Sequence, residues 1–353
     1  MTVIESPFRN NYLLTSAAIL VPLLLVAVMS LFRRKSAFNV SGRTVLITGG
    51  SQGMGLSVAQ KLSARGANIV IVARDTAKLD SAISTIQSAA SSPTSQRFLS
   101  LSYDLTDPKS APEILARVTE WNNHTPPDVV WCCAGFCIPS FFADADIKTL
   151  RDQMDTLYWS CAYMAHATLN LWKRPTASTT TDSEANSLKS SGTQRSAKDA
   201  LPRHLIFTCS CLAFFPTAGY APYSPAKAAM RALADTLQPE IAVWNGARLS
   251  ANPSISSAAP SHEIRLSTSP DEVAAAALRG LDAGEIAVTT NFVGNLMRGC
   301  GMGGTLRMGV MDVFWNFLGS IVILFFNWDF VKQSQRWGRE KGVRVAELPA
   351  NEA

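Results

Sequence analysis

The sequence predicts an α/β fold with a doubly wound parallel sheet, and three observations carry that prediction. Short runs of β-branched residues alternate with longer segments of helical periodicity. A glycine-rich stretch, TGGSQGMG at 48–55, follows the first of these runs. Apolar stretches lie near both ends of the chain, outside the alternating region. We therefore expect a central α/β domain at 37–300 between membrane-associated segments at 1–36 and 301–353.

The composition favours a membrane-attached protein over a freely soluble one. Of the 353 residues, 47% are hydrophobic and 17% are charged, and the mean hydropathy is +0.10. The net charge of +5 is small, and the basic residues form no long run with interleaved aromatics. We therefore expect no nucleic acid among the partners of this chain.

The cysteines and histidines do not predict a metal site. Seven cysteines show no C-x-x-C pair and no regular spacing, and the four histidines are scattered. We expect reduced thiols on a cytosol-facing protein and no bound metal.

The first apolar stretch, from Tyr12 to Phe32, contains no charged residue and is long enough to cross a bilayer as a helix. A cleaved signal peptide is the second interpretation and a buried core helix the third, because the stretch is apolar all round. Arg33, Arg34 and Lys35 follow it directly. The positive-inside rule then places the central domain on the cytosolic side of the membrane.

The second apolar stretch, at 310–328, is interrupted by Asp312 and Asn316. Basic residues lie on both sides of it, so a single crossing would leave one basic group on the wrong face of the membrane. An interfacial or re-entrant helix fits at least as well as a full span.

Five strand-helix units in succession predict the doubly wound sheet of the central domain. The expected strands are 44–48, 68–73, 98–104, 128–134 and 204–210, and the expected helices are 53–65, 76–90, 112–122, 147–173 and 224–244. Two stretches break the pattern. The Ser/Thr-rich stretch 173–203 predicts a disordered insertion, and 245–261 predicts a further loop.

The glycine-rich stretch lies where a Rossmann-type fold binds the phosphates of a dinucleotide. Gly49, Gly53 and Gly55 allow a tight turn and close approach of the backbone to a pyrophosphate at the start of a helix. Ser51 and Gln52, between these glycines, are further candidates for contact with the cofactor. A simple glycine-rich turn is the alternative, because such spacing also arises by chance.

The end of the second strand indicates the preferred nucleotide. Folds that prefer NAD carry an acidic residue there for the ribose 2′-hydroxyl, whereas this chain has Ala73 followed by Arg74. The guanidinium of Arg74 suits a 2′-phosphate, so we expect NADPH. Lys78 is a second candidate for that phosphate, although an exposed helix lysine is an equally good interpretation.

A tyrosine and a lysine four residues apart form the candidate catalytic pair. Tyr223 and Lys227 share one face at the predicted start of a helix, with Pro225 in its first turn. A phenol has an unperturbed pKa of about 10, and a nearby ammonium group favours its phenolate. Ser210, at the end of the preceding strand, offers a hydroxyl to a carbonyl oxygen, and the alternative for it is a turn serine.

In this order along the chain, these features resemble the short-chain dehydrogenase/reductase family, together with Asp104-Leu105 and CCAG at 132–135. The resemblance implies that Tyr223 donates a proton to the carbonyl oxygen of the substrate. It also implies that Lys227 lowers the pKa of that tyrosine and binds the nicotinamide ribose, and that Ser210 orients the carbonyl group. Asp104 and Leu105 would flank the adenine, and Ala134 would contact the cofactor.

Within that family the chain is similar to the fungal reductases of 3-ketodihydrosphingosine. The similarity is carried by CCAG, MDTLYWSCAYMAHATL, GYAPYSPAKAAMRALADTLQPE and VTTNFVGNLMR, together with the terminal apolar stretches. It implies NADPH-dependent reduction of a long-chain sphingoid ketone at the cytosolic face of the endoplasmic reticulum. Membrane lipid is then an expected partner, and a homo-oligomer is left open.

Two departures from the family pattern qualify this expectation. Leu157 stands where the family has an asparagine that holds a proton-relay water, so we expect slower turnover. The stretch 262–266 was the expected start of a sixth strand, yet no Pro-Gly turn or substrate loop follows it. Two alternatives therefore stay open, namely a reductase of another lipid ketone and a catalytically impaired NADPH-binding membrane protein.

Overall fold

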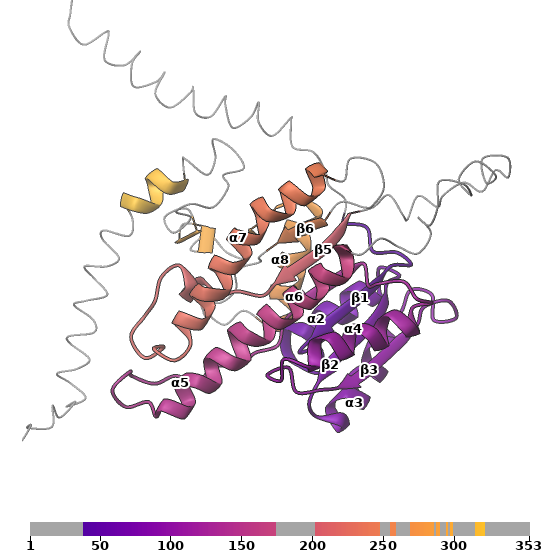
Figure 1. The fold of residues 1–353 in the computed structure, drawn as a ribbon, viewed down its shortest axis with the longest axis horizontal. Coiled ribbons are helices and arrows are strands. Elements are labelled where there is room, and N and C mark those ends of the chain that lie inside the picture. The colour runs from indigo at the N-terminus through magenta and orange to yellow at the C-terminus, as the bar shows by residue number, and fades with distance from the viewer. Residues whose placement is uncertain are drawn as a thin grey trace, which may run out of the picture.

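The structure, a computed structural model, describes residues 38–173, 202–247, 255–258, 269–285, 287–289, 294–295, 297–298 and 315–321. These residues form a layer of parallel strands between two layers of helices (Figure 1). The strands are β1 (Thr44–Thr48), β2 (Asn68–Ala73), β3 (Phe98–Ser102), β4 (Val129–Cys132), β5 (Arg203–Phe207) and β6 (Ile255–Ala258). The main helices are α2 (Gly53–Ser63), α3 (Thr76–Ser88), α4 (Ser110–Trp121), α5 (Ile147–Met154), α6 (Ser160–Lys173), α7 (Ser224–Ala247) and α8 (Pro270–Asp282).

The strand order β3-β2-β1-β4-β5-β6 confirms the doubly wound parallel sheet. The chain builds outward from β1 to β3, then returns to the other side of β1 and builds outward again from β4 to β6. The direction of winding therefore reverses between β1 and β4. In open α/β sheets a crevice forms at this point, outside the carboxyl ends of the strands.

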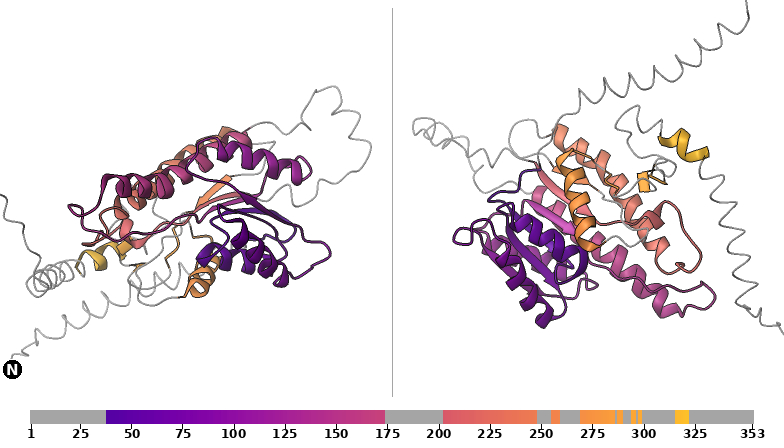
Figure 2. Two further views of the ribbon diagram at one scale, coloured as in Figure 1. Left: turned by 90° about the horizontal axis from the view of Figure 1, so that it is seen from below. Right: turned by 180° about the vertical axis from the view of Figure 1, so that it is seen from behind.

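The two faces of the sheet bury separate apolar cores. One core joins the sheet to α2, α3 and α8, and the other joins it to α4, α6 and α7. Figure 2 shows the two helix layers on opposite faces of the sheet. The central strand β1 has no exposed residue, as expected for a strand covered on both faces.

Side-chain caps fix where several helices begin. Asp75 accepts a hydrogen bond from the backbone N–H of Lys78 at the start of α3, and Asp146 accepts one from Thr149 at the start of α5. At α8, Ser269 and Glu272 form a reciprocal capping box ahead of a first turn that begins with proline. Each cap satisfies backbone donors that have no partner within the helix.

Ion pairs at both ends of α8 hold this helix against α2 and the residues that follow α2. Lys61 Nζ lies 2.7 Å from a carboxylate oxygen of Asp271, near the start of α8. Arg65 donates two hydrogen bonds to Asp282, at 2.9 and 3.0 Å, at the end of α8. These contacts place the first turn of α8 beside the glycine loop, at the edge of the crevice.

The predicted elements are confirmed with small shifts at their ends, except in one region. Three strands end two or three residues before their predicted ends, and the residue after each of them keeps one backbone hydrogen bond to the neighbouring strand. The loop predicted at 245–261 is wrong, since 245–247 belong to α7 and 255–258 form β6 parallel to β5. The sixth strand therefore precedes 262–266, a stretch that lies outside the described residues. Helix α8 follows that stretch at Pro270–Asp282.

Both predicted membrane segments fall largely outside the described part of the chain. This holds for 12–32 and for most of 310–328, of which residues 315–321 form a short helix. Among the described residues, no helix combines the length and the apolar character that a membrane crossing needs. Most of the insertion predicted at 173–203 is likewise outside the described ranges, with Lys173 ending α6 and Arg203 starting β5.

The half-buried His204 makes the fold sensitive to acid. Burial, and then the positive charge of Arg43, lower the pKa of His204 from 6.5 to about 4. The unfolded chain therefore binds a proton below pH 6.5 that the folded chain rejects, so we expect stability to fall as the pH drops from about 6.5 to about 4, by at most about 3 kcal/mol. Chemical denaturation at about pH 5 and about pH 7.5 measures the effect. In His204→Gln this part of the pH dependence should disappear, and an unchanged difference would contradict the assignment.

Candidate active site

A cavity of about 520 Å³ lies at the carboxyl ends of the strands, where the winding direction reverses. Its wall brings together segments that are far apart in the sequence. All the predicted cofactor-binding residues line it, namely Gly49, Ser51, Gln52, Gly53, Gly55, Arg74, Lys78, Asp104, Leu105, Ala134, Tyr223 and Lys227. Their individual roles stay predictions, but the structure places them around one space.

The glycine loop is shaped by two positions that only glycine can occupy. Gly49 has φ +70°, and a Cβ atom there would lie 2.6 Å from Ala134 Cα. At Gly55 a Cβ atom would lie 2.3 Å from the carbonyl oxygen of Gly49. The loop therefore folds onto itself and onto the end of β4, and this contact brings the start of α2 to the cavity.

Gly53 has a different environment, because a Cβ atom there would meet nothing within 4 Å. Its φ of +58° turns the chain at the first residue of α2, and Gly53 and Met54 line the cavity, so the N-terminus of α2 borders that space. This is the arrangement in which a helix N-terminus and a glycine loop accept a pyrophosphate. A dinucleotide therefore fits the residues present.

The two glycines should respond differently to alanine. We expect Gly55→Ala to destabilise the fold by about 1–3 kcal/mol, because the new methyl group overlaps a backbone carbonyl. In Gly53→Ala the new methyl group meets no atom, so backbone strain should lower the free energy of unfolding by only about 1–2 kcal/mol. The main effect of this variant should be weaker cofactor binding. Thermal unfolding and cofactor titration of both variants separate the effects. A larger loss of stability in Gly53→Ala than in Gly55→Ala, or unchanged cofactor binding in Gly53→Ala, would contradict this reading of the loop.

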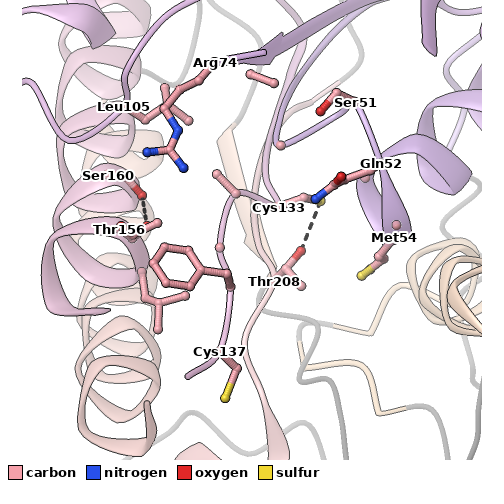
Figure 3. Close-up of a pocket in the computed structure, with 18 of the residues that line it drawn as sticks. Ser51, Gln52, Met54, Arg74, Leu105, Cys133, Cys137, Thr156, Ser160 and Thr208 are labelled. Atoms are coloured by element: carbon pink, nitrogen blue, oxygen red, sulfur yellow. Dashed lines mark hydrogen bonds between the residues drawn. The ribbon is translucent and has the colours of Figure 1, made fainter. Parts of the chain in front are cut away.

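Arg74 reaches into the cavity opposite the glycine loop. Figure 3 shows its guanidinium group on one side of the space and Ser51 with Gln52 on the other. Asp104 lies on the same side as Arg74, and Thr106 holds it with backbone and hydroxyl hydrogen bonds of 3.0 and 2.8 Å. These hydrogen bonds, with a smaller contribution from Arg74, lower the pKa of Asp104. Arg74 and Asp104 therefore carry opposite charges side by side at the predicted adenosine end.

Lys78 is less available than Arg74. Its ammonium group lies 3.8 Å from a carboxylate oxygen of Asp75, and both side chains are about half exposed. Asp75 also caps α3 through the N–H of Lys78. The residue lines the cavity, as predicted, but its charge is partly compensated by its neighbour.

Tyr223 and Lys227 lie together at the other end of the cavity. Lys227 is 4% exposed and Tyr223 is 8% exposed, and Lys227 Nζ lies 5.7 Å from the centre of the phenol ring. Lys227 donates a hydrogen bond of 2.8 Å to the carbonyl oxygen of Thr208. A buried ammonium beside a phenol is the electrostatic setting that favours proton loss from that phenol.

Ser210 occupies a different position from the other predicted residues. It has no exposed surface, and it is absent from the cavity wall. Its hydroxyl oxygen accepts a hydrogen bond of 3.2 Å from the N–H of Leu212 and so caps the short 3₁₀ turn Cys211–Ala213. In the structure Ser210 therefore acts as a turn serine. Its role toward a substrate carbonyl stays a prediction.

Thr208 is a component of the site that the sequence did not indicate. Its hydroxyl group accepts a hydrogen bond of 3.1 Å from the indole N–H of Trp131 and lies 3.2 Å from Cys133 Sγ. The second of these contacts is drawn in Figure 3. Burial raises the pKa of Cys133 to about 12, so its thiol stays protonated. Through these contacts β4 fixes the carbonyl group that binds Lys227.

Leu157 lies beside the reactive end, in a π-helical turn between α5 and α6. This turn, Asp155–Trp159, interrupts the helix predicted at 147–173. The Leu157 side chain is fully buried and packs in one cluster with Tyr223 and Ala226. π-helical turns of this kind often occur at functional sites. Here an apolar side chain fills the position from which an amide could have faced the tyrosine.

The first turn of α8 forms part of the cavity wall. In the family pattern we expected a substrate loop at this place. Pro270 and Val273 line the cavity. The ion pairs of α8 with α2 hold these two residues in place. The cavity therefore has an apolar side near the glycine loop that is formed by a helix.

Comparison with known proteins identifies the family. A family profile described as short chain dehydrogenase matches residues 43–180. The chain is 42% identical over 344 residues to the 3-ketodihydrosphingosine reductase ksrA of Aspergillus fumigatus, covering 88% of each protein. The chain belongs to the short-chain dehydrogenase/reductase family. It is also 35% identical to the 3-ketodihydrosphingosine reductase gsl-3 of Neurospora crassa, covering 94% of this chain and 92% of the relative.

Solved structures of short-chain dehydrogenases share the fold. LigD of Sphingobium sp. strain SYK-6, in its apo form, aligns with a TM-score of 0.56 at 15% identity, covering 71% of this chain and 90% of that protein. A metagenomic short-chain oxidoreductase in complex with NADP aligns with a TM-score of 0.52 at 19% identity, covering 72% and 99%. This short-chain dehydrogenase/reductase therefore has the fold of its family despite low identity to these structures.

Proposed function

We propose that this enzyme reduces the ketone of 3-ketodihydrosphingosine to the alcohol dihydrosphingosine, with NADPH as the reductant, in sphingolipid biosynthesis. The observation that carries the proposal is the single cavity that joins the glycine loop and Arg74 to the buried Tyr223–Lys227 pair. Relatives named as reductases of this ketone match nearly the full chain, which favours it over other lipid ketones.

When bound, the cofactor supplies a hydride to the carbonyl carbon of the substrate. Tyr223 then gives its phenolic proton to the carbonyl oxygen, so that C=O becomes CH–OH. The Lys227 ammonium, held by Thr208, stabilises the phenolate that remains. In this proposal Ser210 orients the carbonyl oxygen, which requires the substrate to reach its hydroxyl group within the 3₁₀ turn.

The preference for NADPH is supported by the charges at the opposite end of the cavity. Arg74 is exposed to the cavity and carries a planar fork of donors that suits a 2′-phosphate. The second strand has no acidic side chain at its end, where Ala73 stands. A ribose with a free 2′-hydroxyl would therefore lack its usual carboxylate acceptor.

We further propose that the enzyme resides in the endoplasmic reticulum membrane with its active site facing the cytosol. The charge-free stretch 12–32 and the three basic residues that follow it support this orientation. A membrane location suits a substrate with a long alkyl chain, because each buried CH₂ group favours the lipid phase by about 0.8 kcal/mol.

An assay on membranes that contain the full 353-residue chain tests the function. We expect oxidation of NADPH that depends on added 3-ketodihydrosphingosine and yields dihydrosphingosine by mass spectrometry. A ketosteroid and a 3-ketoacyl thioester serve as competitors, and neither should slow the reaction at matched concentrations. Absence of the product, with cofactor binding intact, would favour the catalytically impaired alternative. Preferential reduction of a competitor would reassign the substrate.

A further inference from the structure

A loop beside the active site exposes an unusual number of large apolar side chains. We define the apolar loop as residues 136–147, which follow β4 and end at the first residue of α5. Phe142 and Ile147 are each 70% exposed, and Phe141 is 42% exposed. Phe136 and Ile138 add surfaces that are 39% and 40% exposed. Isolated exposed apolar residues are normal, but a contiguous group of them on one loop marks an interaction surface.

The projecting part of this loop carries no charge. Residues 136–143 read FCIPSFFA, and the first acidic residue is Asp144. Asp146 accepts backbone and hydroxyl hydrogen bonds from Thr149, so its carboxylate is engaged at the start of α5. An uncharged loop tip can leave water without desolvating an ionised group.

The apolar loop continues into the active site. Phe136 and Cys137 line the cavity. Ser140 donates a backbone hydrogen bond of 2.8 Å to the carbonyl oxygen of Gly219. This bond ties the loop to the segment that ends at Tyr223. A molecule that slides along the exposed side chains therefore arrives at the reactive end of the cavity.

A second described segment also exposes large apolar side chains. Helix 315–321 exposes Phe317 by 69% and Ile321 by 44%. In Figure 1 this helix, drawn in yellow, lies at the upper left and the loop before α5 lies at the lower left, with α7 between them.

We propose that the apolar loop docks on the surface of a lipid bilayer and receives the ketone substrate directly from it. The inference rests on the proposed function, because a sphingoid ketone has a polar head and a long alkyl chain that stays in lipid. Its head must reach Tyr223 while the chain remains in apolar surroundings. The apolar loop offers that continuous path between the bilayer and the cavity.

A bilayer fits this surface better than a second copy of the chain. The predicted membrane span ends at Phe32, and five residues separate it from Phe38, where the described fold begins. Such a linker reaches roughly 20 Å at most, so a membrane span at 12–32 would keep the fold near lipid. Phe38 itself packs against His204 at the amino ends of the strands, so the side chains of the apolar loop, and not the linker, select the face that meets the bilayer. Aromatic and aliphatic side chains that project from a loop suit the interface between water and acyl chains.

The first test compares two ways of presenting the ketone to the reconstituted full-length enzyme. One substrate is the long-chain ketone in phosphatidylcholine vesicles, and the other is a short-chain, water-soluble 3-keto analogue. The variant Phe142→Asp/Ile147→Asp places two charges on the apolar loop. The control Ser84→Asp/Gln87→Asp adds two charges on the exposed face of α3, away from the apolar loop and outside the cavity wall.

We expect the loop variant to lose at least about tenfold in kcat/KM on the vesicle substrate and less than about twofold on the soluble analogue. The control should keep its kcat/KM on both substrates. The variant Phe142→Leu/Ile147→Leu should keep its kcat/KM on the vesicle substrate. Equal loss on both substrates, or no loss on either, would overturn the proposal. A loop variant that changes the size of the protein in detergent would identify a second copy as the occupant and would also overturn it.

A second measurement does not depend on catalysis. Phe142→Trp places an indole on the apolar loop, and vesicles with brominated acyl chains quench the fluorescence of residues that enter the bilayer. We expect more quenching than in the unmodified protein, and equal quenching would refute docking. If neither ketone is reduced while the indole is quenched, the proposed function fails and the docking surface stands.

Discussion

Tyr223→Phe is expected to reduce ketone reduction by about 10²- to 10⁴-fold, because the variant keeps the ring but removes the proton that the carbonyl oxygen needs. The phenol ring is 8% exposed and packs in a small apolar cluster with Leu157 and Ala226. Phenylalanine retains that packing, so folding should be unaffected. Reductase activity and NADPH binding are measured on the same membranes, and binding should be unchanged within about twofold.

Tyr220→Phe provides a matched control for this experiment. Tyr220 precedes the same helix, packs in the same apolar cluster and does not line the cavity. We expect it to retain nearly full activity. Full activity in Tyr223→Phe would disprove the assignment of the proton donor, and equal loss in both variants would indicate a structural effect of the ring hydroxyls.

Arg74→Ala is expected to lower kcat/KM for NADPH by about 10- to 100-fold while leaving the value for NADH nearly unchanged. A hydrogen bond to a charged group contributes about 1.5–3 kcal/mol, and only NADPH carries the 2′-phosphate that Arg74 would bind. Arg74→Glu should have a higher kcat/KM with NADH than with NADPH. A carboxylate accepts a hydrogen bond from the ribose 2′-hydroxyl and repels a 2′-phosphate. Initial rates with each cofactor measure the ratio.

Two further arginine and lysine variants make this result specific. Lys78→Ala should have a smaller effect than Arg74→Ala, because Asp75 already compensates part of its charge. Arg117→Ala removes an exposed charge from α4, away from the cavity, and should change neither cofactor constant. If Arg74→Ala weakens NADH and NADPH equally, the guanidinium contributes general attraction and does not recognise the 2′-phosphate.

The parts of the site that the sequence predicted depend on local signals. Gly49 and Gly55 predict a tight loop after a buried strand. The four-residue spacing of Tyr223 and Lys227 predicts that they share one helix face. Each of these pairs is separated by only a few residues, so its geometry follows from the local backbone conformation. Their meeting in one cavity follows from the strand order, which the alternation of strands and helices also predicted.

Other features depend on contacts between distant segments and leave no local signal. Thr208 acquires its role because pairing of β4 with β5 brings its hydroxyl group to Trp131 and Cys133. For Ser210 the sequence left two interpretations open, and only the three-dimensional structure shows that its hydroxyl group caps a turn. Strand β6 has the sequence ISSA, which is short and small enough to resemble a loop. Its strand geometry comes from the partner β5, which outweighs weak local preference.

The contact between Gly135 and Leu157 links two positions that lie 22 residues apart in the numbering. A Cβ atom at 135 would lie 2.6 Å from Leu157 Cδ2, so a side chain at 135 would require the Leu157 side chain to move. Substitutions at 135 and 157 should therefore have coupled effects on stability, because a smaller side chain at 157 would leave room for a side chain at 135.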